Sequence, residues 1–459
     1  MSHADRGDAY KPSRFNVVTR AEAGGLVIYN SMRGSIFRIT PPTDDRVHDL
    51  LHNRNAVLRR DEDQGELFDA LLDRGFLVDA DHDELAAAEE VSARRKNRTD
   101  VLDLIIMPTE ACNFRCHYCY EDFALGRMLT SVREGVRNLV RERHAATPLR
   151  RLTVSWFGGE PLVAFEVIEE LSAFFLSFCE ENGVEYSAAV TTNGYLLTED
   201  VARRCLDLGI TRYQITLDGP RDAHDASRYL IGGGRTYDTI LANLDGMAAL
   251  SDDFHVTLRT NFTSENDARV PELIDELARH FSGDARFDAI YRPVGEWGGP
   301  QDAETGAHSG KEAELRKLEL CSHAADHGLS HGDDRMLRPH GSVCYAASPW
   351  SFVIRPNGVV NKCTVALRDE RNAVGLLRED GDLGLNAERM GLWVDTDDTS
   401  DSGCQTCFFR PACQGAACPL VRLEEERRPC PPHKVWIGPT IETYAAMARR
   451  TARSKAAAG

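Results

Sequence analysis

The feature that most limits how this chain can fold is a regular alternation that begins at residue 101. Apolar, strand-like runs are followed by segments with the spacing of amphipathic helices, least clearly after the last run. The expected strands are VLDLIIMP, LTVSWFGG, YSAAVTTNG, YQITLDG, HVTLRTN and RFDAIYRP. Such alternation requires parallel strands and right-handed crossovers. Because a closed barrel has eight such repeats, we predict an α/β fold with an open, partial (β/α)6 barrel over residues 101–305, whose chemistry lies at the carboxyl ends of the strands.

Blocks of different composition flank the predicted barrel. Residues 13–82 combine strand-like runs around glycine turns with helix-like segments, which predicts a small α+β module. Residues 83–100 are rich in alanine and charged on all sides, which predicts a solvated linker helix. Residues 306–440 lose the alternation and gain cysteine, so we expect metal to hold them together. Residues 441–459 are expected to form a C-terminal helix or frayed tail.

Composition narrows the partners and the compartment. The net charge of -18 disfavours nucleic acid and anionic membranes, which need clustered lysine and arginine. The amino terminus has no apolar signal segment, and no run approaches the ~18 apolar residues that span a bilayer, so we expect a cytoplasmic protein. In that reducing compartment, the 13 cysteines are better explained as metal ligands than as disulfides.

Three cysteines directly follow the first predicted barrel strand: Cys112, Cys116 and Cys119. Three thiolates on so short a loop suit one face of an iron-sulfur cube and leave one iron without a protein ligand. The alternative is a zinc knuckle completed by His117 or by a distant residue. Because His117 is adjacent to Cys116, such ligation would strain the loop, and we expect its side chain to point elsewhere.

The pattern C-x-x-x-C-x-aromatic-C, with Tyr118 at the aromatic position, resembles the signature of the radical S-adenosylmethionine (radical SAM) enzymes. The resemblance implies a [4Fe-4S] cluster whose open iron binds SAM, with Tyr118 near the cofactor. It also implies a reductant such as flavodoxin or ferredoxin, and reductive cleavage of SAM to a 5'-deoxyadenosyl radical that abstracts hydrogen from the substrate.

The segment WFGGEP resembles the motif that holds the SAM amino group in this family. Gly158 and Gly159 would let backbone approach a ligand, and Glu160 would accept a hydrogen bond from the amine. The alternative for the glycines is a tight strand-to-helix turn. Polar residues at the ends of the next strands are expected to reach the ribose and carboxylate of SAM, and these are Thr192, Asn193, Thr216 and Asp218.

The segment HDASRYLIGGGRTYDTILANL resembles the family pattern in which an arginine after His-Asp meets the SAM carboxylate. That arginine would be Arg228 here. The alternative is a surface ion pair between Arg228 and Asp225 or Asp222.

The tail contains seven cysteines: Cys344, Cys363, Cys404, Cys407, Cys413, Cys418 and Cys430. Their spacing resembles that of the SPASM domain of peptide-modifying radical SAM enzymes, which binds two auxiliary [4Fe-4S] clusters. By the ligation of that family, the outer cluster would be held by Cys404, Cys407, Cys413 and Cys430, and the inner cluster by Cys344, Cys363 and Cys418. Four residues separate Cys413 from Cys418, where three are usual. The inner cluster is one ligand short, which leaves either an open iron for a substrate thiolate or ligation by another side chain such as Cys321. Two zinc sites are the alternative for the tail.

Two further cysteines, Cys179 and Cys205, fall on apolar helix faces and are expected to be buried core residues. The amino-terminal module resembles the winged-helix-like recognition element of many peptide maturases. It would bind the leader of a precursor peptide by strand addition, and its alternative is a structural cap on the barrel.

The function that these resemblances imply is maturation of a ribosomally made peptide by a thioether or carbon-carbon crosslink. The alternatives are a maturase of a protein target, similar to the enzymes that oxidise the active-site residue of sulfatases, and a non-catalytic, metal-stabilised peptide-binding scaffold. Four polar residues near the last strand are candidates for a base or for orienting the peptide: Asp288, Tyr291, Arg292 and Glu296.

Overall fold

The computed structural model describes residues 9–22, 24–60, 65–295, 310–395 and 399–458. The chain divides into two compact units. The barrel unit comprises Arg98–Gly332 and Ser348–Asp395, and the terminal unit comprises Met1–Asn97, Asp333–Ala347 and Thr396–Gly459. These units do not coincide with the predicted ranges, because residues 306–440 are shared between them. Within the part of the chain that the structure describes, no helix is both long and apolar enough to cross a bilayer.

The core of the barrel unit is a parallel sheet made of the six expected strands, which confirms the predicted fold class. Each strand neighbours the next in chain order and is parallel to it. They are β6 (Val101–Ile106), β8 (Arg151–Trp156), β9 (Glu185–Thr192), β10 (Ile210–Thr216), β12 (His255–Phe262) and β13 (Phe287–Pro293).

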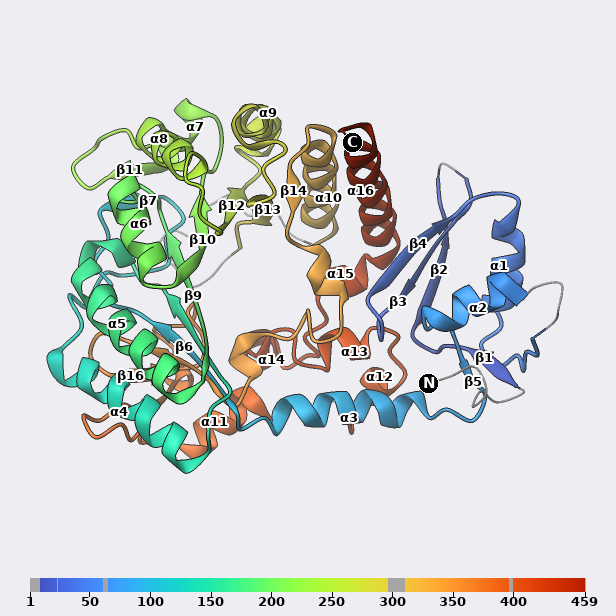
Figure 1. Cartoon of the computed structure of the whole chain (residues 1–459), viewed down its shortest axis with the longest axis horizontal. Coiled ribbons are helices and arrows are strands. Elements are labelled where there is room, and N and C mark those ends of the chain that lie inside the picture. Colours follow the sequence, from blue (N-terminus) through green and yellow to red (C-terminus); the bar gives the residue numbers. More distant parts are fainter. Residues whose placement is uncertain (1–8, 23, 61–64, 296–309, 396–398, 459) are drawn as a thin grey trace. The chain divides into compact units, whose positions relative to one another are not determined.

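Helices lie along the outer face of this curved sheet (Figure 1). Alternate strand residues such as Leu152, Val154 and Trp156 are fully buried, as are Ile168 and Phe175 on the covering helix α5. This alternation is the pattern expected of strands with an amphipathic helix against them. The helices are α4 (Thr130–Ala146), α5 (Phe165–Asn182), α6 (Glu199–Asp207), α7 (Arg221–Ser227), α8 (Tyr237–Ala248), α9 (Val270–Phe281) and α10 (Gly310–Asp326).

Four further strands extend the sheet to ten, which the sequence did not predict. β14 (Ser330–His331) pairs with β13 at one edge, and β15 (Ser351–Ile354) pairs in parallel with β6 at the other. β16 (Val359–Asn361) and β17 (Ala373–Leu376) continue antiparallel from β15, and α11 (Ala387–Val394) follows. We expected metal to hold residues 306–440 together, but this stretch also has an apolar core, since Phe352, Ile354 and Val360 are buried.

The terminal unit contains the α+β elements expected between residues 13 and 82. β2 (Asn16–Arg20), β3 (Leu26–Asn30) and β4 (Ser35–Ile39) form an antiparallel sheet, while β1 (Tyr10–Pro12) pairs with β5 (Leu77–Asp79). Their apolar core includes Leu26, Ile28, Val47, Phe68 and Phe76. The helices are α1 (Thr43–Leu51), α2 (Gly65–Asp73) and, packed against β3 and β4, the C-terminal helix α16 (Ile437–Ala458).

The predicted linker helix exists as α3 (Glu84–Lys96), but it is not solvated on all sides. Glu84, Ala88 and Ser92 form a buried face, and α3 packs against α13 (Arg410–Cys413). Because Ala88 and Ser92 are small, the backbones of α3 and α13 can approach each other. A search for large apolar residues does not predict such a buried face. The remaining short helices of the cysteine-rich segment are α12 (Ser402–Gln405), α14 (Pro419–Glu425) and α15 (Pro432–Val435).

Candidate active site and cluster sites

The loop that carries the first three cysteines follows β6, at the carboxyl edge of the parallel strands. Within it, β7 (Phe114–Cys116) forms a short antiparallel ladder with β11 (Arg228–Leu230), in which Arg228 lies opposite Cys116. The ladder continues on both sides: the His117 amide donates to the Ser227 carbonyl at 3.0 Å, and the Ile231 amide donates to the Asn113 carbonyl at 2.8 Å. The loop is therefore fixed by main-chain bonds to the segment after β10.

The donor set of the loop fits an iron-sulfur cluster. Cys112, Cys116 and Cys119 are all partly buried, and burial raises the pKa of the Cys112 and Cys119 thiols to about 12. Such thiols ionise only with a cation beside them, so metal binding releases their protons. The Phe114 amide already donates to the Cys112 sulfur at 3.3 Å.

The sulfur spacing is wider than a single zinc ion requires. Ligand atoms around tetrahedral zinc at ~2.3 Å are only about 3.8 Å apart. Among the described residues, two groups of three metal-ligating side chains lie within 4.8 Å, and neither contains a cysteine. His117 is exposed and packs edge-on against Tyr229, with 6.0 Å between the ring centroids, as expected for a side chain that points away.

Glu160 joins the ends of β8 and β9. Its fully buried carboxylate accepts hydrogen bonds from the Leu162 amide at 3.0 Å, the Thr192 hydroxyl at 2.7 Å and the Asn193 amide at 2.7 Å. Burial raises the pKa of Glu160, although these donors oppose the shift. Because a carboxylate has about four acceptor sites, three donors leave room for one more. The Asn193 side chain donates at 2.7 Å to Asn113, which lies in the loop that carries Cys112, Cys116 and Cys119, called the cluster loop below. This bond links the Glu160 network to the cysteines.

The two glycines before Glu160 pack against the chain itself. A Cβ on Gly158, where φ is +130°, would lie 2.3 Å from the Thr109 carbonyl oxygen. One on Gly159 would lie 2.3 Å from the Glu110 carbonyl oxygen and 2.6 Å from that of Ala111. Close packing of the strand-to-helix turn on the start of the cluster loop therefore accounts for both glycines without a ligand.

Tyr118 lies at the centre of a second buried network. Its hydroxyl accepts from Arg228 Nη1 at 2.5 Å and from Asn261 Nδ2 at 3.0 Å, and it donates to Asp218 Oδ2. Arg228 and Asp218 form an ion pair at 3.5 Å with side chains only 8% and 1% exposed. The surface pairing considered for Arg228 is therefore wrong: Asp222 pairs with Arg269 at 2.7 Å instead.

Asp225, the other partner considered for Arg228, accepts instead from the Thr236 and Tyr237 amides at 2.8 and 2.9 Å. Behind it, His224 is fully buried and lies between Asp218 and Thr236. The Asp218 amide donates to His224 Nδ1 at 3.3 Å, and Nε2 lies 3.1 Å from the Thr236 hydroxyl. Burial lowers the pKa of His224 well below its usual value, and the Arg228 charge lowers it further.

Asn261 and Asn113 are members of these networks that we did not predict from the sequence. Asn261 lies near the carboxyl end of β12, and its amide also donates to Asp218 Oδ1 at 2.8 Å. A polar residue near a strand's carboxyl end was the available signal. No sequence pattern singled out Asn113 within its loop. Thr216, which we did predict, is buried at the end of β10.

The four candidates near the last strand separate in space. Asp288 is the second residue of β13, at the opposite edge from the cysteines, where it pairs with His255 at 2.9 Å. Tyr291 is buried, and the Cys321 thiol on α10 adds to the effect of burial in raising its pKa, so this hydroxyl lies on the helix-covered side. Neither position suits a base at the site. Glu296 lies outside the described residues.

Arg292 is the candidate that lies near the carboxyl end of β13. Arg292 lies close enough to Arg259 on β12 to act on its ionisation. Burial lowers the pKa of Arg259, and the positive charge of Arg292 lowers it further. Arg259 donates to the Asn261 side chain at 2.8 Å and is close enough to Tyr118, Tyr120 and Asp218 to feel their charge. The carboxyl edge of the sheet therefore carries a cationic pair of arginines beside the Tyr118 network.

Four cysteines of the tail, which we predicted as ligands of the outer cluster, line one cavity in the terminal unit. Cationic side chains surround them: Arg410, Arg428 and Lys434 line the same cavity, and Lys434 Nζ lies 3.5 Å from the Cys430 sulfur. Four thiolates that held a cluster here would carry negative charge, which these cations would offset. The cysteines are Cys404, Cys407, Cys413 and Cys430.

The amino-terminal module contacts this cysteine-rich segment within the terminal unit. The Tyr29 hydroxyl donates to the Leu337 carbonyl at 2.6 Å, and its ring lies 6.3 Å from that of Phe409. Burial raises the pKa of Tyr29, and the nearby Cys413 and Cys407 add to the shift. The module is thus packed on the cysteine-rich segment.

The three cysteines predicted for the inner cluster belong to different units. Cys344 and Cys418 are in the terminal unit, where the Cys344 amide donates to the Ala416 carbonyl at 2.8 Å. Cys363 is in the barrel unit just after β16, and its sulfur accepts from the Val365 amide at 3.4 Å. Cys321 is buried on α10 near Tyr291. Inner-cluster ligation by these residues stays a prediction.

Cys179 and Cys205 are buried, as predicted. Burial raises the pKa of Cys179 to about 11 and that of Cys205 to about 12, so both are poor nucleophiles.

The sequence profile of the Radical SAM superfamily matches residues 106–277, which include the three-cysteine loop and both buried networks. These residues are a radical SAM domain. Among curated proteins, this radical SAM domain resembles Fe-coproporphyrin III synthase of Methanosarcina barkeri, with 26% identity over 172 residues, 37% of this chain and 39% of the relative. It also resembles GTP 3',8-cyclase of Xanthomonas campestris pv. campestris, with 30% identity over 188 residues, 39% of this chain and 51% of that enzyme. The match thus spans at most about half of these relatives.

Solved structures resemble more of the chain. Native anSMEcpe with bound AdoMet and Kp18Cys peptide has a TM-score of 0.57 at 16% identity and covers 77% of this chain and 99% of its own. Streptococcus suis SuiB bound to precursor peptide SuiA has a TM-score of 0.50 at 14% identity and covers 91% of this chain and 97% of its own. At such identities the likeness shows the radical SAM α/β fold with additional domains.

Proposed function

We propose that this protein is a radical SAM enzyme that removes a hydrogen atom from a residue of a ribosomally made precursor peptide and thereby forms a thioether or carbon-carbon crosslink. The observation that carries the proposal is the meeting of the three-cysteine loop with the Glu160 and Tyr118 networks at one edge of the sheet. The β7–β11 ladder and the bond from Asn193 to Asn113 hold these parts together.

When bound, a [4Fe-4S] cluster and SAM would supply the chemistry of reductive SAM cleavage and hydrogen abstraction. The chain's own residues hold and orient the parts. Cys112, Cys116 and Cys119 ligate the cluster, and Glu160 accepts a hydrogen bond from the SAM ammonium group. Arg228 offers positive charge to the SAM carboxylate, in place of part of its pairing with Asp218.

The remaining predicted SAM contacts lie at the carboxyl edge of the sheet. Tyr118, Asn193 and Asp218 present polar atoms to the ribose and carboxylate of SAM. Thr192 and Thr216 are the last residues of β9 and β10. Gly158 and Gly159 act indirectly, because they let the Glu160 turn pack on the cluster loop. Arg292 and Arg259 face the peptide, where they would favour an acidic or carbonyl-rich partner over a cationic one.

The peptide substrate is supported by the architecture of the whole chain. The SuiB complex with its precursor peptide covers 91% of this chain, including much of what lies outside the radical SAM domain. In the described amino-terminal module, the three-stranded sheet has β2 and β4 at its edges, and we propose that a leader segment adds to one of them. Leader tethering would raise the local concentration of the reacting residue.

A second candidate is modification of a residue in a protein target. It is favoured by the likeness to anSMEcpe, whose solved complex holds a Kp18Cys peptide. That likeness covers 77% of this chain, less than the SuiB likeness does.

We propose three [4Fe-4S] clusters, the two auxiliary ones held by Cys404, Cys407, Cys413 and Cys430 and by Cys344, Cys363 and Cys418. The test is anaerobic reconstitution followed by iron analysis and incubation with SAM and dithionite, with Cys116→Ala as the inactive variant and Cys179→Ala as its matched control. We expect 5'-deoxyadenosine from the wild type and Cys179→Ala only. Wild-type protein that binds no iron, or that releases no 5'-deoxyadenosine, contradicts the proposal.

The substrate is tested by mass spectrometry of a candidate peptide with and without its leader. A loss of two hydrogens that requires the leader supports crosslinking guided by the amino-terminal module. Oxidation of an isolated sulfatase-type peptide without a leader supports the second candidate.

A further inference from the structure

In the barrel unit, two histidines at the end of α10 meet a carboxylate on α9. Asp275 lies on α9, His323 lies in the last turn of α10, and His327 follows the end of α10. One ligand atom from each lies within 4.8 Å of the others. The side chains are 44%, 33% and 41% exposed, so the group is open to ions from solution.

The separations within this group match the ligand shell of a single metal ion. Asp275 Oδ1 lies 2.7 Å from His323 Nε2 and 3.4 Å from His327 Nε2, and the two rings lie 4.4 Å apart. Ligand atoms bound tetrahedrally at ~2.1 Å are about 3.4 Å apart. A small opening of the shorter contact would therefore place an ion at bonding distance from all three atoms.

The hydrogen-bond donors point to a cation between these groups. His327 Nδ1 lies 2.9 Å from the His323 carbonyl oxygen, which can only accept, so this nitrogen carries the hydrogen. A neutral ring would then turn its Nε2 lone pair toward the Asp275 carboxylate, and a metal ion between them would bind both. A carbonyl bond on the remote ring nitrogen is also the arrangement that orients histidine ligands in metal sites.

The position of the two histidines at the end of α10 also favours a cation. The C-terminal end of a helix carries partial negative charge, and α10, which spans 17 residues, ends at Asp326 between the two histidines. Together with the Asp275 carboxylate, this end favours a positively charged ligand.

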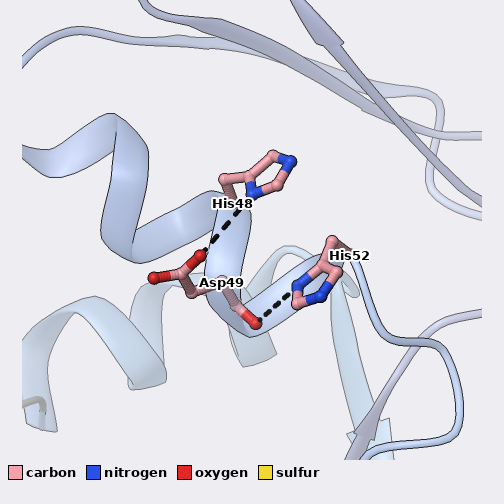
Figure 2. A group of neighbouring side chains, drawn as sticks. All are labelled: His48, Asp49 and His52. Atoms are coloured by element: carbon pink, nitrogen blue, oxygen red, sulfur yellow. Dashed lines mark hydrogen bonds and ion pairs between the residues drawn. The ribbon is translucent and has the colours of Figure 1, made fainter.

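The other such group in the described residues is less suited. His48, Asp49 and His52 all lie on or next to α1, and Asp49 is bonded to His52 through its backbone oxygen at 3.1 Å, as Figure 2 shows. The Asp49 side chain is 80% exposed and 3.6 Å from His48. An ion there would join no second element.

We infer that Asp275, His323 and His327 bind a divalent transition-metal ion of the kind that imidazole favours, with water completing the shell, and that this ion joins α9 to α10. Imidazole and carboxylate ligands suit Zn2+, Ni2+ and Cu2+. Three protein ligands plus water is a common shell for zinc. None of these three residues is a proposed cluster ligand, so the inference does not depend on the proposed radical chemistry.

The test measures Zn2+ binding to the full chain with its clusters loaded, under anaerobic conditions. Calorimetry compares the wild type with His323→Ala and His327→Ala. The matched control is His280→Ala, because His280 also lies on α9 and pairs with a carboxylate, Asp245, at 2.8 Å. We expect each of the two test variants to weaken one Zn2+ site at least tenfold, whereas His280→Ala leaves it unchanged.

A second readout guards against misfolded variants. Asp275→Asn keeps the size of the side chain but removes its charge, and we expect the rise in melting temperature that Zn2+ gives the wild type to shrink in this variant. Equal Zn2+ affinity and stoichiometry in the wild type and His323→Ala would overturn the inference. So would the absence of wild-type binding at millimolar Zn2+.

Discussion

Arg228 lies opposite Cys116 in the β7–β11 ladder, and its guanidinium group pairs with Asp218 at 3.5 Å. The Arg228 backbone thus joins the cluster loop to the segment after β10. The Arg228 side chain joins that segment to the end of β10. The cluster loop and the residues proposed to contact SAM are therefore coupled, and damage to either part is expected to affect the other.

Arg228→Gln leaves the Asp218 charge buried and without its ion pair. We expect a loss of about 3–5 kcal/mol in unfolding free energy and weaker SAM binding, because breaking a buried pair costs more than the pair itself contributes. Denaturant unfolding and SAM titration measure the two effects. The control is Arg221→Gln, whose partner Asp238 is 56% exposed and whose loss should cost under about 1 kcal/mol. Equal losses in both variants would show that Arg228 is not a buried partner.

Gly159→Ala introduces a Cβ 2.3 Å from the Glu110 carbonyl oxygen. Backbone on both sides of this contact has to move, so we expect a cost of at least about 1–3 kcal/mol and poorer iron retention by the cluster loop. Iron per chain after gel filtration is the measurement. Gly126→Ala is the matched control, because a Cβ at Gly126 meets nothing within 4 Å. Normal iron content in Gly159→Ala would contradict the packing described here.

Arg355 and Glu110 form an ion pair at 2.7 Å, with Glu110 only 2% exposed, between the turn after β15 and the start of the cluster loop. We expect Arg355→Gln to destabilise the barrel unit by about 3 kcal/mol, because Glu110 is left buried with its charge. Arg368→Gln removes the more exposed pair with Asp122 at 3.2 Å and should cost under about 1 kcal/mol. Chemical denaturation followed by tryptophan fluorescence compares the two variants.

His224 predicts a dependence of stability on pH. Burial lowers its pKa well below the value of about 6.5 that it has in the unfolded chain, so protonation favours the unfolded state. The contribution of neutral His224 to the unfolding free energy is complete above pH ~6.5. As the pH falls below this value, that contribution is lost by up to about 1.4 kcal/mol per pH unit. We expect His224→Gln to show a shallower loss between pH 7.5 and 5.5, whereas substitution of the exposed His82 leaves the slope unchanged. Parallel slopes in all three proteins would contradict the assignment.

Cys404→Ala tests the cavity in the terminal unit. If Cys404, Cys407, Cys413 and Cys430 hold one cluster, the variant should lose about four iron atoms per chain and keep the absorption of the others. Cys205→Ala, a buried cysteine on α6, should keep them all. Zinc in the cavity of the anaerobically purified wild type would rule out the cluster.

The sequence predicted the parts of the fold that local pattern determines. The six barrel strands follow from apolar runs separated by helical spacing, and the position of the cysteines follows from the strand before them. The pairing of β15 with β6 was missed, because nothing local marks a partner about 250 residues away, such as Val353 for Ile105. The buried face of α3 was missed because Ala88 and Ser92 lack the size that signals burial.

The candidate site was predicted in the same uneven way. Glu160 and Asp218 follow strand ends and resemble family motifs, and the structure brings both close to the cluster loop. Asp288 was placed wrongly, although its position as the second residue of its strand already put it at the far edge of the sheet. The β7–β11 ladder consists of three-residue strands, too short for any periodicity to reveal.

The pairing of β15 with β6 also sets an order of events during synthesis. β6 and the cluster loop leave the ribosome long before β15, and Arg355 follows Glu110 by 245 positions. Until that late segment arrives, one edge of β6 stays unpaired and the cysteine loop lacks part of its anchor. The cluster loop therefore gains its full set of contacts only after the chain has been made as far as Arg355.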